Sequence, residues 1–155
     1  KYFCVILLTL LFFNFTGKII LGDAGSYLLS LSTGFLLIKF AFENSTIPPF
    51  FIILLLWYPC YELLFSMIRR MNSKKTMFKP DVYHFHQVLY KFFEKKLNNK
   101  RNLNHLIVSA IINIYNLITV MIGINYIHQS NKLMFIILTN IAFYTVVYFV
   151  LRRRL

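Results

Sequence analysis

The stretch KIILGDAGSYL, from Lys18 to Leu28, marks the point at which one apolar segment ends and the next begins. Asp23 lies in this stretch between Gly22 and Gly25, and it is one of only five acidic residues in a chain with a formal net charge of +12. A carboxylate at the start of an apolar segment is expected to bind a cation, to cap the helix or to contact a substrate. The stretch therefore predicts both a helix boundary and a candidate site.

Composition places the rest of the chain in a membrane. Of its 155 residues, 58% are hydrophobic and 14% are charged, whereas soluble domains are about half apolar and a quarter charged. Continuous apolar runs of this kind need lipid around them. We predict an all-α, polytopic transmembrane bundle in which residues 1–155 form a single integral-membrane domain. Its five expected spans are residues 2–15, 26–42, 50–68 (kinked at Pro59), 104–127 and 133–151.

The basic residues predict the orientation of the bundle. The segment from Arg69 to Arg101 holds ten of the seventeen Lys and Arg residues, and the chain ends in Arg152–Arg154 followed by Leu155. By the positive-inside rule, loops with such residues face the cytoplasm. Lys18 adds the Asp23 loop to that side, so loops 17–25 and 70–103 are both expected to be cytoplasmic.

The second half of the long basic loop has the periodicity of an amphipathic helix. In FHQVLYKFFEKKL, apolar residues recur at helical spacing while Lys91, Glu94 and Lys95 fall on another face. A basic amphipathic helix between two spans is expected to lie in the membrane interface. The apolar positions are Phe85, Val88, Leu89, Phe92, Phe93 and Leu97.

Asp23 has two readings from local sequence. It could cap a helix starting near Ser26, by accepting from free backbone N–H groups. It could instead bind a hard cation, since Mg²⁺ takes one or two protein carboxylates and completes its shell with water and phosphate oxygens. The flanking glycines would let a phosphate approach closely.

The segment KPDVYHFHQ, residues 79–87, is the second candidate site. Asp81 is placed to cap the helix that follows, and His84 and His86 would lie in its first turn, where anions are favoured. Residues two apart in a regular helix point to different sides, so a shared site requires an irregular turn. The alternative is two interfacial histidines without a catalytic role. His-x-His without a third ligand is a weak zinc pattern.

Glu62 is the third candidate, because acidic residues inside membrane spans are costly and usually functional or paired. Since it lies near the cytoplasmic end of its span, it could also extend its carboxylate to the interface beside Arg69. The basic cluster could attract anionic lipid or a nucleotide diphosphate. His105 and His128 have no partners in sequence, and no role is assigned to them.

Three segments in this order resemble the polyprenyl-phosphate N-acetylhexosamine-1-phosphate transferases, the family that initiates O-antigen and peptidoglycan lipid intermediates. FFNFTGKIILGDAGSYLLS is similar to the family's glycine-aspartate-x-glycine-serine loop opening a membrane helix. PCYELLFSMIRR resembles its proline-x-x-acid helix, and KPDVYHFHQVLY its cytoplasmic histidine loop. Departures from the family pattern occur at Val82, Gln87 and Glu62, which stand where the family has arginine, histidine and aspartate.

The resemblance implies roles for particular residues. Asp23 would be the ligand of Mg²⁺ (or Mn²⁺), and His84 and His86 would join it in catalysis. The remaining positions are expected to bind substrate or shape the site: Gly22, Gly25, Ser26, Arg70, Asp81 and Gln87.

The implied enzyme transfers N-acetylhexosamine 1-phosphate from a UDP-sugar to polyprenyl phosphate, with release of UMP, in the bacterial inner membrane. Its active site would face the cytoplasm, among membrane lipids, and a homodimer is compatible with the sequence. The family's upstream acidic motifs do not occur here, so we expect the chain to be the C-terminal part of a longer enzyme and to be inactive alone. The rival is a non-enzymatic transporter or scaffold with a lipid-binding basic loop. Nucleic-acid binding is not expected, because topology accounts for the basic charge.

Overall fold

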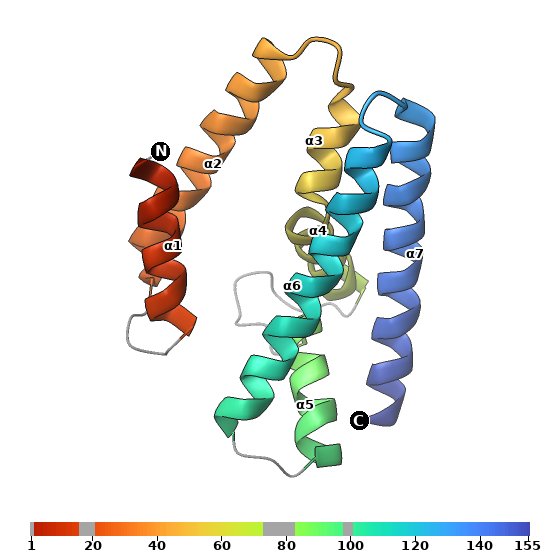
Figure 1. Ribbon diagram of the computed structural model, residues 1–155. Coiled ribbons are helices and arrows are strands. Elements are labelled where there is room, and N and C mark those ends of the chain that lie inside the picture. The colour runs from red at the N-terminus through yellow and green to blue at the C-terminus, as the bar shows by residue number, and fades with distance from the viewer. Residues whose placement is uncertain (1, 16–20, 73–82, 98–100) are drawn as a thin grey trace. The chain divides into compact units, whose positions relative to one another are not determined.

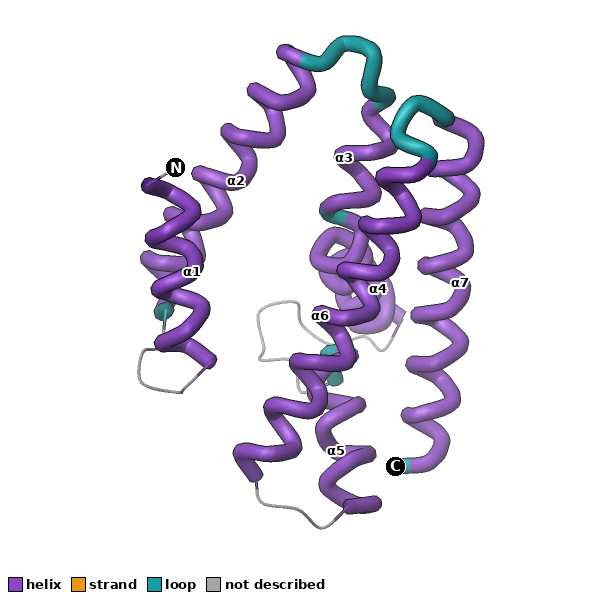
Figure 2. Tube along the Cα trace, in the orientation of Figure 1, coloured by secondary structure: helices purple, strands orange, loops and turns teal. Residues whose placement is uncertain are grey.

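The computed structural model describes residues 2–15, 21–72, 83–97 and 101–155, and within these ranges every regular element is a helix (Figures 1 and 2). This confirms the predicted all-α class. The chain divides into two compact units, residues 1–45 and 46–155. The helices are α1 (Tyr2–Phe15), α2 (Gly22–Glu43), α3 (Pro49–Leu55), α4 (Trp57–Asn72), α5 (Phe85–Leu97), α6 (Arg101–Asn125) and α7 (Ser130–Arg154).

The first unit contains α1 and α2. With 14 described residues, α1 is about 21 Å long, which is shorter than a bilayer core of about 30 Å. The 22 residues of α2 suffice for a span. The helix begins at Gly22, so the predicted start at Ser26 is wrong. Ser26 is already inside the helix, where its hydroxyl donates to the Gly22 carbonyl at 2.8 Å, a bond that competes with capping.

The second unit begins with a broken helix. The axes of α3 and α4 differ by 71° across the break at Leu56, three residues before the proline at which a kink was expected. A proline ring in a helix clashes with the carbonyl four residues earlier, which for Pro59 belongs to Leu55, the last residue of α3. Pro59 itself then falls in the first turn of α4, where its missing N–H costs nothing.

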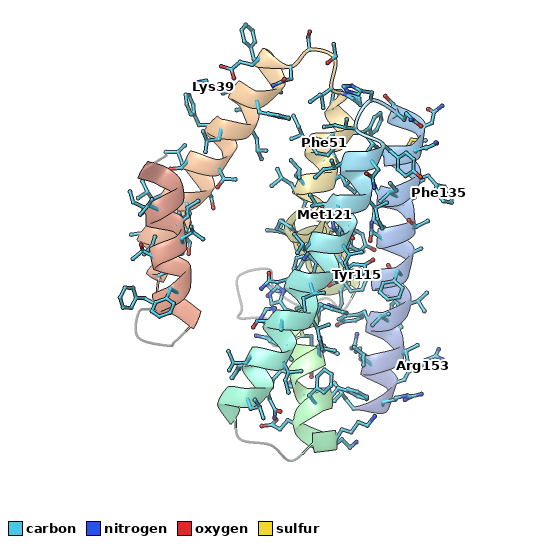
Figure 3. All side chains as sticks on the ribbon, in the orientation of Figure 1. Lys39, Phe51, Tyr115, Met121, Phe135 and Arg153 are labelled. Carbon is cyan, nitrogen blue, oxygen red and sulfur yellow. The ribbon has the colours of Figure 1, made fainter. Side chains whose placement is uncertain are left out.

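Three described helices, α2, α6 and α7, are long and apolar enough to cross a membrane, or four if α3 and α4 count as one bent span. Their outward faces are apolar, as shown by Phe135, whose side chain is 68% exposed and projects from α7 (Figure 3). The inward face of α7 is partly polar. Asn140 accepts from the hydroxyls of Tyr115 and Thr119 on α6, and such bonds support helix association in lipid.

The predicted amphipathic helix is confirmed as α5, with the expected bounds Phe85–Leu97. Val88 and Leu89 are buried, while Lys91 and Glu94 are exposed. Its apolar face packs against α6 and α7 (Figure 1). Protein therefore covers much of the surface that the periodicity assigned to lipid, and α5 is held as part of the bundle.

Close packing of α3 on α6 depends on Gly123. A Cβ atom at this position would lie 2.3 Å from Leu54 Cδ2 and 3.8 Å from Phe51 Cε2. Leu54 is fully buried, so its side chain can shift only by displacing the residues packed around it. We expect Gly123→Ala to lower the free energy of unfolding by about 1–3 kcal/mol, the usual cost of overpacking. Thermal unfolding in detergent measures it.

The matched control is Gly34→Ala on α2, where, apart from the helix's own backbone, no atom of the described residues lies within 4 Å of the added Cβ. Because alanine favours helix over glycine by up to about 1 kcal/mol, this variant should be neutral or slightly more stable. Equal midpoints for Gly123→Ala and the wild type would contradict the packing of α3 on α6.

Candidate active site

Glu62 on α4 contacts three polar groups from other segments of the second unit. Its Oε1 accepts from the backbone N–H of Phe85 at 2.9 Å and lies 3.0 Å from His84 Nδ1. Its Oε2 accepts from the hydroxyl of Tyr144 on α7. The Glu62 carboxylate thus links α4 to the start of α5 and to α7. Of the alternatives predicted for Glu62, the structure shows a carboxylate paired with other residues.

The first turn of α5 is capped from two directions. His84 occupies the N-cap position, and its carbonyl accepts from the N–H groups of Gln87 and Val88, both at 2.9 Å. Gln87 Oε1 reaches back to the His84 N–H at 3.3 Å, as the third residue does in a capping box. Glu62 takes the Phe85 N–H. Asp81, the predicted cap, lies outside the described residues.

His84 and His86 lie on the same side of the chain. Their rings stack with centroids 5.8 Å apart and planes inclined by 10°. This is achieved because His84 precedes the helix, which begins at Phe85. The irregular turn that a shared site requires is therefore present.

A cationic cluster surrounds the ring of Tyr83, immediately before the histidine pair. Arg69, Lys91 and Arg152 place their cationic groups 5.7, 5.1 and 5.5 Å from its centroid. They come from α4, α5 and α7. The Tyr148 hydroxyl donates to the Tyr83 carbonyl at 3.1 Å. The histidine turn thus lies in a region of concentrated positive charge, which favours anions.

The pKa of His86 lies below its usual value of about 6.5, because partial burial disfavours the charged imidazolium. Glu62 opposes this shift, and His84 and His105 reinforce it. The ring is also partly exposed to solvent, which limits the effect. The lowered pKa favours the neutral imidazole of His86, which can accept a proton.

The same shift predicts a pH dependence of stability. Since the unfolded chain binds the His86 proton more readily than the folded chain, stability should fall as the pH drops below about 6.5 and be unaffected well above it. We expect the thermal midpoint to fall between about pH 7.5 and 5.5, and to fall less in His86→Gln. His128→Gln, at the α6–α7 turn, should keep the wild-type fall. An equal fall in His86→Gln would contradict the shift.

The Asp23 loop belongs to the first unit. Asp23 is exposed in the first turn of α2, and its carboxylate makes no hydrogen bond or ion pair with any residue that the structure describes. No side chain caps α2 at Leu21, so the capping role is not observed. Gly22 has a φ of +64°, which suits glycine. A Cβ at Gly25 would lie 2.8 Å from Leu21 Cγ.

The described residues show no closed metal centre, and Asp23 is the carboxylate that a hard cation could use. Within the described ranges, no three His, Cys, Asp or Glu side chains gather around one point, which a zinc site would require. Mg²⁺ needs only one or two carboxylates when phosphate oxygens and water complete its shell. Asp23, exposed and without a partner among those residues, offers such a carboxylate.

The remaining predicted positions are distributed between the two units. Ser26 lies with Asp23 on α2, and Gln87 lies on α5, where it contacts His84, the residue that precedes the helix. Arg70 is half-buried in the last turn of α4. Tyr144 was not predicted, because one tyrosine among ten in an apolar chain carries no signal. Glu62 was noticed as an acid within a span, but its partners are far away in sequence.

Together, the fold and these contacts define a helical membrane protein with a carboxylate-anchored histidine turn in its second unit and an exposed aspartate in the first turn of α2, in its first unit. Over about half of its length the chain is similar to curated transferases, which confirms the resemblance seen in its motifs. It is 35% identical over 86 residues to undecaprenyl-phosphate alpha-N-acetylglucosaminyl 1-phosphate transferase of Thermotoga maritima, covering 56% of this chain and 27% of that protein. It is 34% identical over 84 residues to the probable undecaprenyl-phosphate N-acetylglucosaminyl 1-phosphate transferase of Bacillus subtilis, covering 53% and 24%.

The matched region spans about a quarter of the length of these curated relatives. No protein-family model and no solved structure matches the chain.

Proposed function

We propose that this chain is part of an enzyme that transfers N-acetylhexosamine 1-phosphate from a UDP-sugar to polyprenyl phosphate. The observation that carries the proposal is its similarity to two proteins named as transferases that act on undecaprenyl phosphate. The stacked histidine pair within a cationic region supports it, since both substrates carry phosphate. The reaction would take place at the cytoplasmic face of the bacterial inner membrane.

In this reaction an oxygen of polyprenyl phosphate attacks the β-phosphorus of the UDP-sugar. The bond between the β-phosphorus and the bridging oxygen breaks, and UMP leaves with the bonding electrons. The products are UMP and a polyprenyl diphosphate sugar. Phosphoryl transfer of this kind depends mainly on positioning and on charge stabilisation.

The residues of this chain would contribute to binding and charge stabilisation. Asp23 would hold Mg²⁺ (or Mn²⁺), which when bound offsets negative charge on phosphate oxygens. Glu62 already occupies the Phe85 N–H, so phosphate contacts near α5 would come from the imidazoles of His84 and His86 and from nearby cations. Lys91 and Arg152 lie on the adjacent surfaces of α5 and α7.

The direct test is UMP release by the full-length protein that carries this sequence, in membranes supplied with undecaprenyl phosphate and UDP-N-acetylglucosamine. Release that requires Mg²⁺ and stops with EDTA is the expected result. Absence of release with this and other UDP-N-acetylhexosamines, in protein shown to be folded, would favour the transporter or scaffold reading.

A further inference from the structure

A basic pocket lies between the last turns of α5 and α7, away from the histidine turn. It is lined by Phe92, Lys95 and Lys96 of α5 and by Arg154 of α7, and its volume is about 330 Å³. We propose that this α5–α7 pocket binds the phosphate headgroup of an anionic phospholipid of the surrounding membrane. The proposal does not depend on the proposed transfer reaction, because phospholipid binding can be measured without turnover.

Two helix ends that are held together form the pocket. Lys95 Nζ donates to the backbone carbonyl of Arg154 at 3.2 Å, so the last turn of α5 lies beside the last turn of α7 (Figure 1). The volume falls at the lower end of the range of about 300–1,000 Å³ for ligand pockets. A pocket of this size can hold a phosphate headgroup.

The charge of the lining favours an anion. Three of the four lining residues are cationic, and no acidic side chain in the described ranges forms an ion pair with any of them. Glu94, the acid next to them on α5, does not line the pocket. Cations at helix ends can simply offset the helix dipole, and Lys95 does so at the Arg154 carbonyl. Lys96 lies 5.9 Å from the centroid of Phe92, and its ammonium and the Arg154 guanidinium can contact a phosphate.

The position of the pocket along α7 places it at the membrane interface. The 25 residues of α7 span about 37 Å, whereas a hydrocarbon core is about 30 Å thick. Arginine is costly inside that core, so the last turn of α7, with Arg152–Arg154, is expected in the headgroup layer. Basic pockets between helices at this level suit anionic headgroups.

An exposed apolar stripe leads along α7 to the pocket. Phe143, Val146, Val150 and Arg154 follow one another at steps of three or four residues, so they share one face of the helix, and all four are exposed. Acyl chains packed along this stripe would bring the phosphate of the same lipid to Arg154. A soluble anion would make no use of the stripe, so the surface favours a lipid as the occupant.

The experiment measures phospholipid binding to the purified full-length protein by native mass spectrometry in a mild detergent. Dioleoyl-phosphatidylglycerol is titrated, and dioleoyl-phosphatidylcholine, which has the same acyl chains and no net charge, is the comparison. We expect phosphatidylglycerol to bind at least about fivefold more tightly than phosphatidylcholine. Lys96→Gln and Arg154→Gln should each weaken its binding about fivefold, the effect of one cation near an anionic lipid surface.

Each variant has a matched control that loses the same charge. Arg153→Gln is the control for Arg154→Gln, because Arg153 is exposed in the same turn but does not line the pocket. Lys132→Gln is the control for Lys96→Gln, because Lys132 also lies beside an aromatic ring, 4.5 Å from the centroid of Tyr126, but in the first turn of α7. Both controls should bind phosphatidylglycerol as the wild type does.

Three results would overturn the proposal. Equal affinity for phosphatidylglycerol and phosphatidylcholine would show that the pocket does not distinguish a charged headgroup. Equal weakening in the variants and their controls would show a diffuse attraction to positive charge in place of a site. Displacement of phosphatidylglycerol by undecaprenyl phosphate at a much lower concentration than phosphatidylglycerol itself requires would assign the pocket to the lipid substrate.

None of these measurements requires UMP release. A protein that binds phosphatidylglycerol as expected but releases no UMP would therefore contradict the proposed function and leave the phospholipid site standing.

Discussion

Asp23→Asn in the full-length protein should reduce Mg²⁺-dependent UMP release by about 10³-fold while leaving the amount of folded protein in the membrane unchanged. A metal ion that offsets charge on transferring phosphate contributes several kcal/mol, and each 1.36 kcal/mol corresponds to about tenfold in rate. Asparagine keeps the shape of the side chain but removes the charge that a hard cation requires. The measurement is the initial rate of UMP release across a range of Mg²⁺ concentrations.

The fold should tolerate this change because Asp23 is exposed and its carboxylate has no hydrogen-bond or ion-pair partner in the part of the chain that the structure describes. Glu43→Gln is a suitable control, since Glu43 lies in the last turn of the same helix and is exposed beside Lys39, 3.8 Å away. Exposed pairs of this kind contribute little, so the control should retain wild-type release. Unimpaired release by Asp23→Asn would remove Asp23 from the metal site.

His84→Asn should lower the turnover number by about 10²-fold, the lower end of the range for loss of a group that exchanges protons or stabilises charge. The asparagine amide retains an N–H donor near the position of Nδ1, so the bond to Glu62 can persist. The substitution removes the second ring nitrogen of His84, Nε2. The turnover number and the KM for the UDP-sugar, measured together, separate an effect on the reaction from an effect on binding.

His128→Asn provides the comparison for this variant. His128 follows α6, where its Nδ1 lies 3.3 Å from the Thr46 carbonyl, and no substrate role is assigned to it. It should behave like the wild type. If His84→Asn also retained full turnover, the histidine turn would be a structural feature of α5, and its phosphate-binding role would have to be abandoned.

Local patterns predicted the elements of this protein well. The 3.6-residue period of FHQVLYKFFEKKL predicted α5 with its observed bounds, because burial of one face is written into the spacing of its apolar residues. Pro59 predicted a break in the third apolar segment, although the break is centred on Leu56, since a proline acts on the carbonyl four residues before it. The predicted start of α2 was wrong because Ser26 bonds within the helix.

Patterns of charge singled out candidate site residues but not their arrangement. His84 and His86 were singled out by type and spacing, but two histidines in this spacing do not say whether they share a side. The observed stacking depends on the helix beginning at Phe85. The cap of that helix comes from Glu62 and Gln87. Asp81, the cap that the local pattern indicated, lies outside the described residues, whereas Glu62 is distant in sequence and no local pattern reveals it.

By itself, the sequence determined that this protein is helical and suited to a membrane, where its basic segment lies, and which acids and histidines are unusual in such a chain. Composition and periodicity are sufficient for this, because they reflect the partition of side chains between lipid, protein and water. Only the tertiary structure decided that Glu62 joins His84 and Tyr144, which are 22 and 82 residues away. Such contacts arise from the packing of α4, α5 and α7, and no local pattern specifies which buried donors a carboxylate will meet.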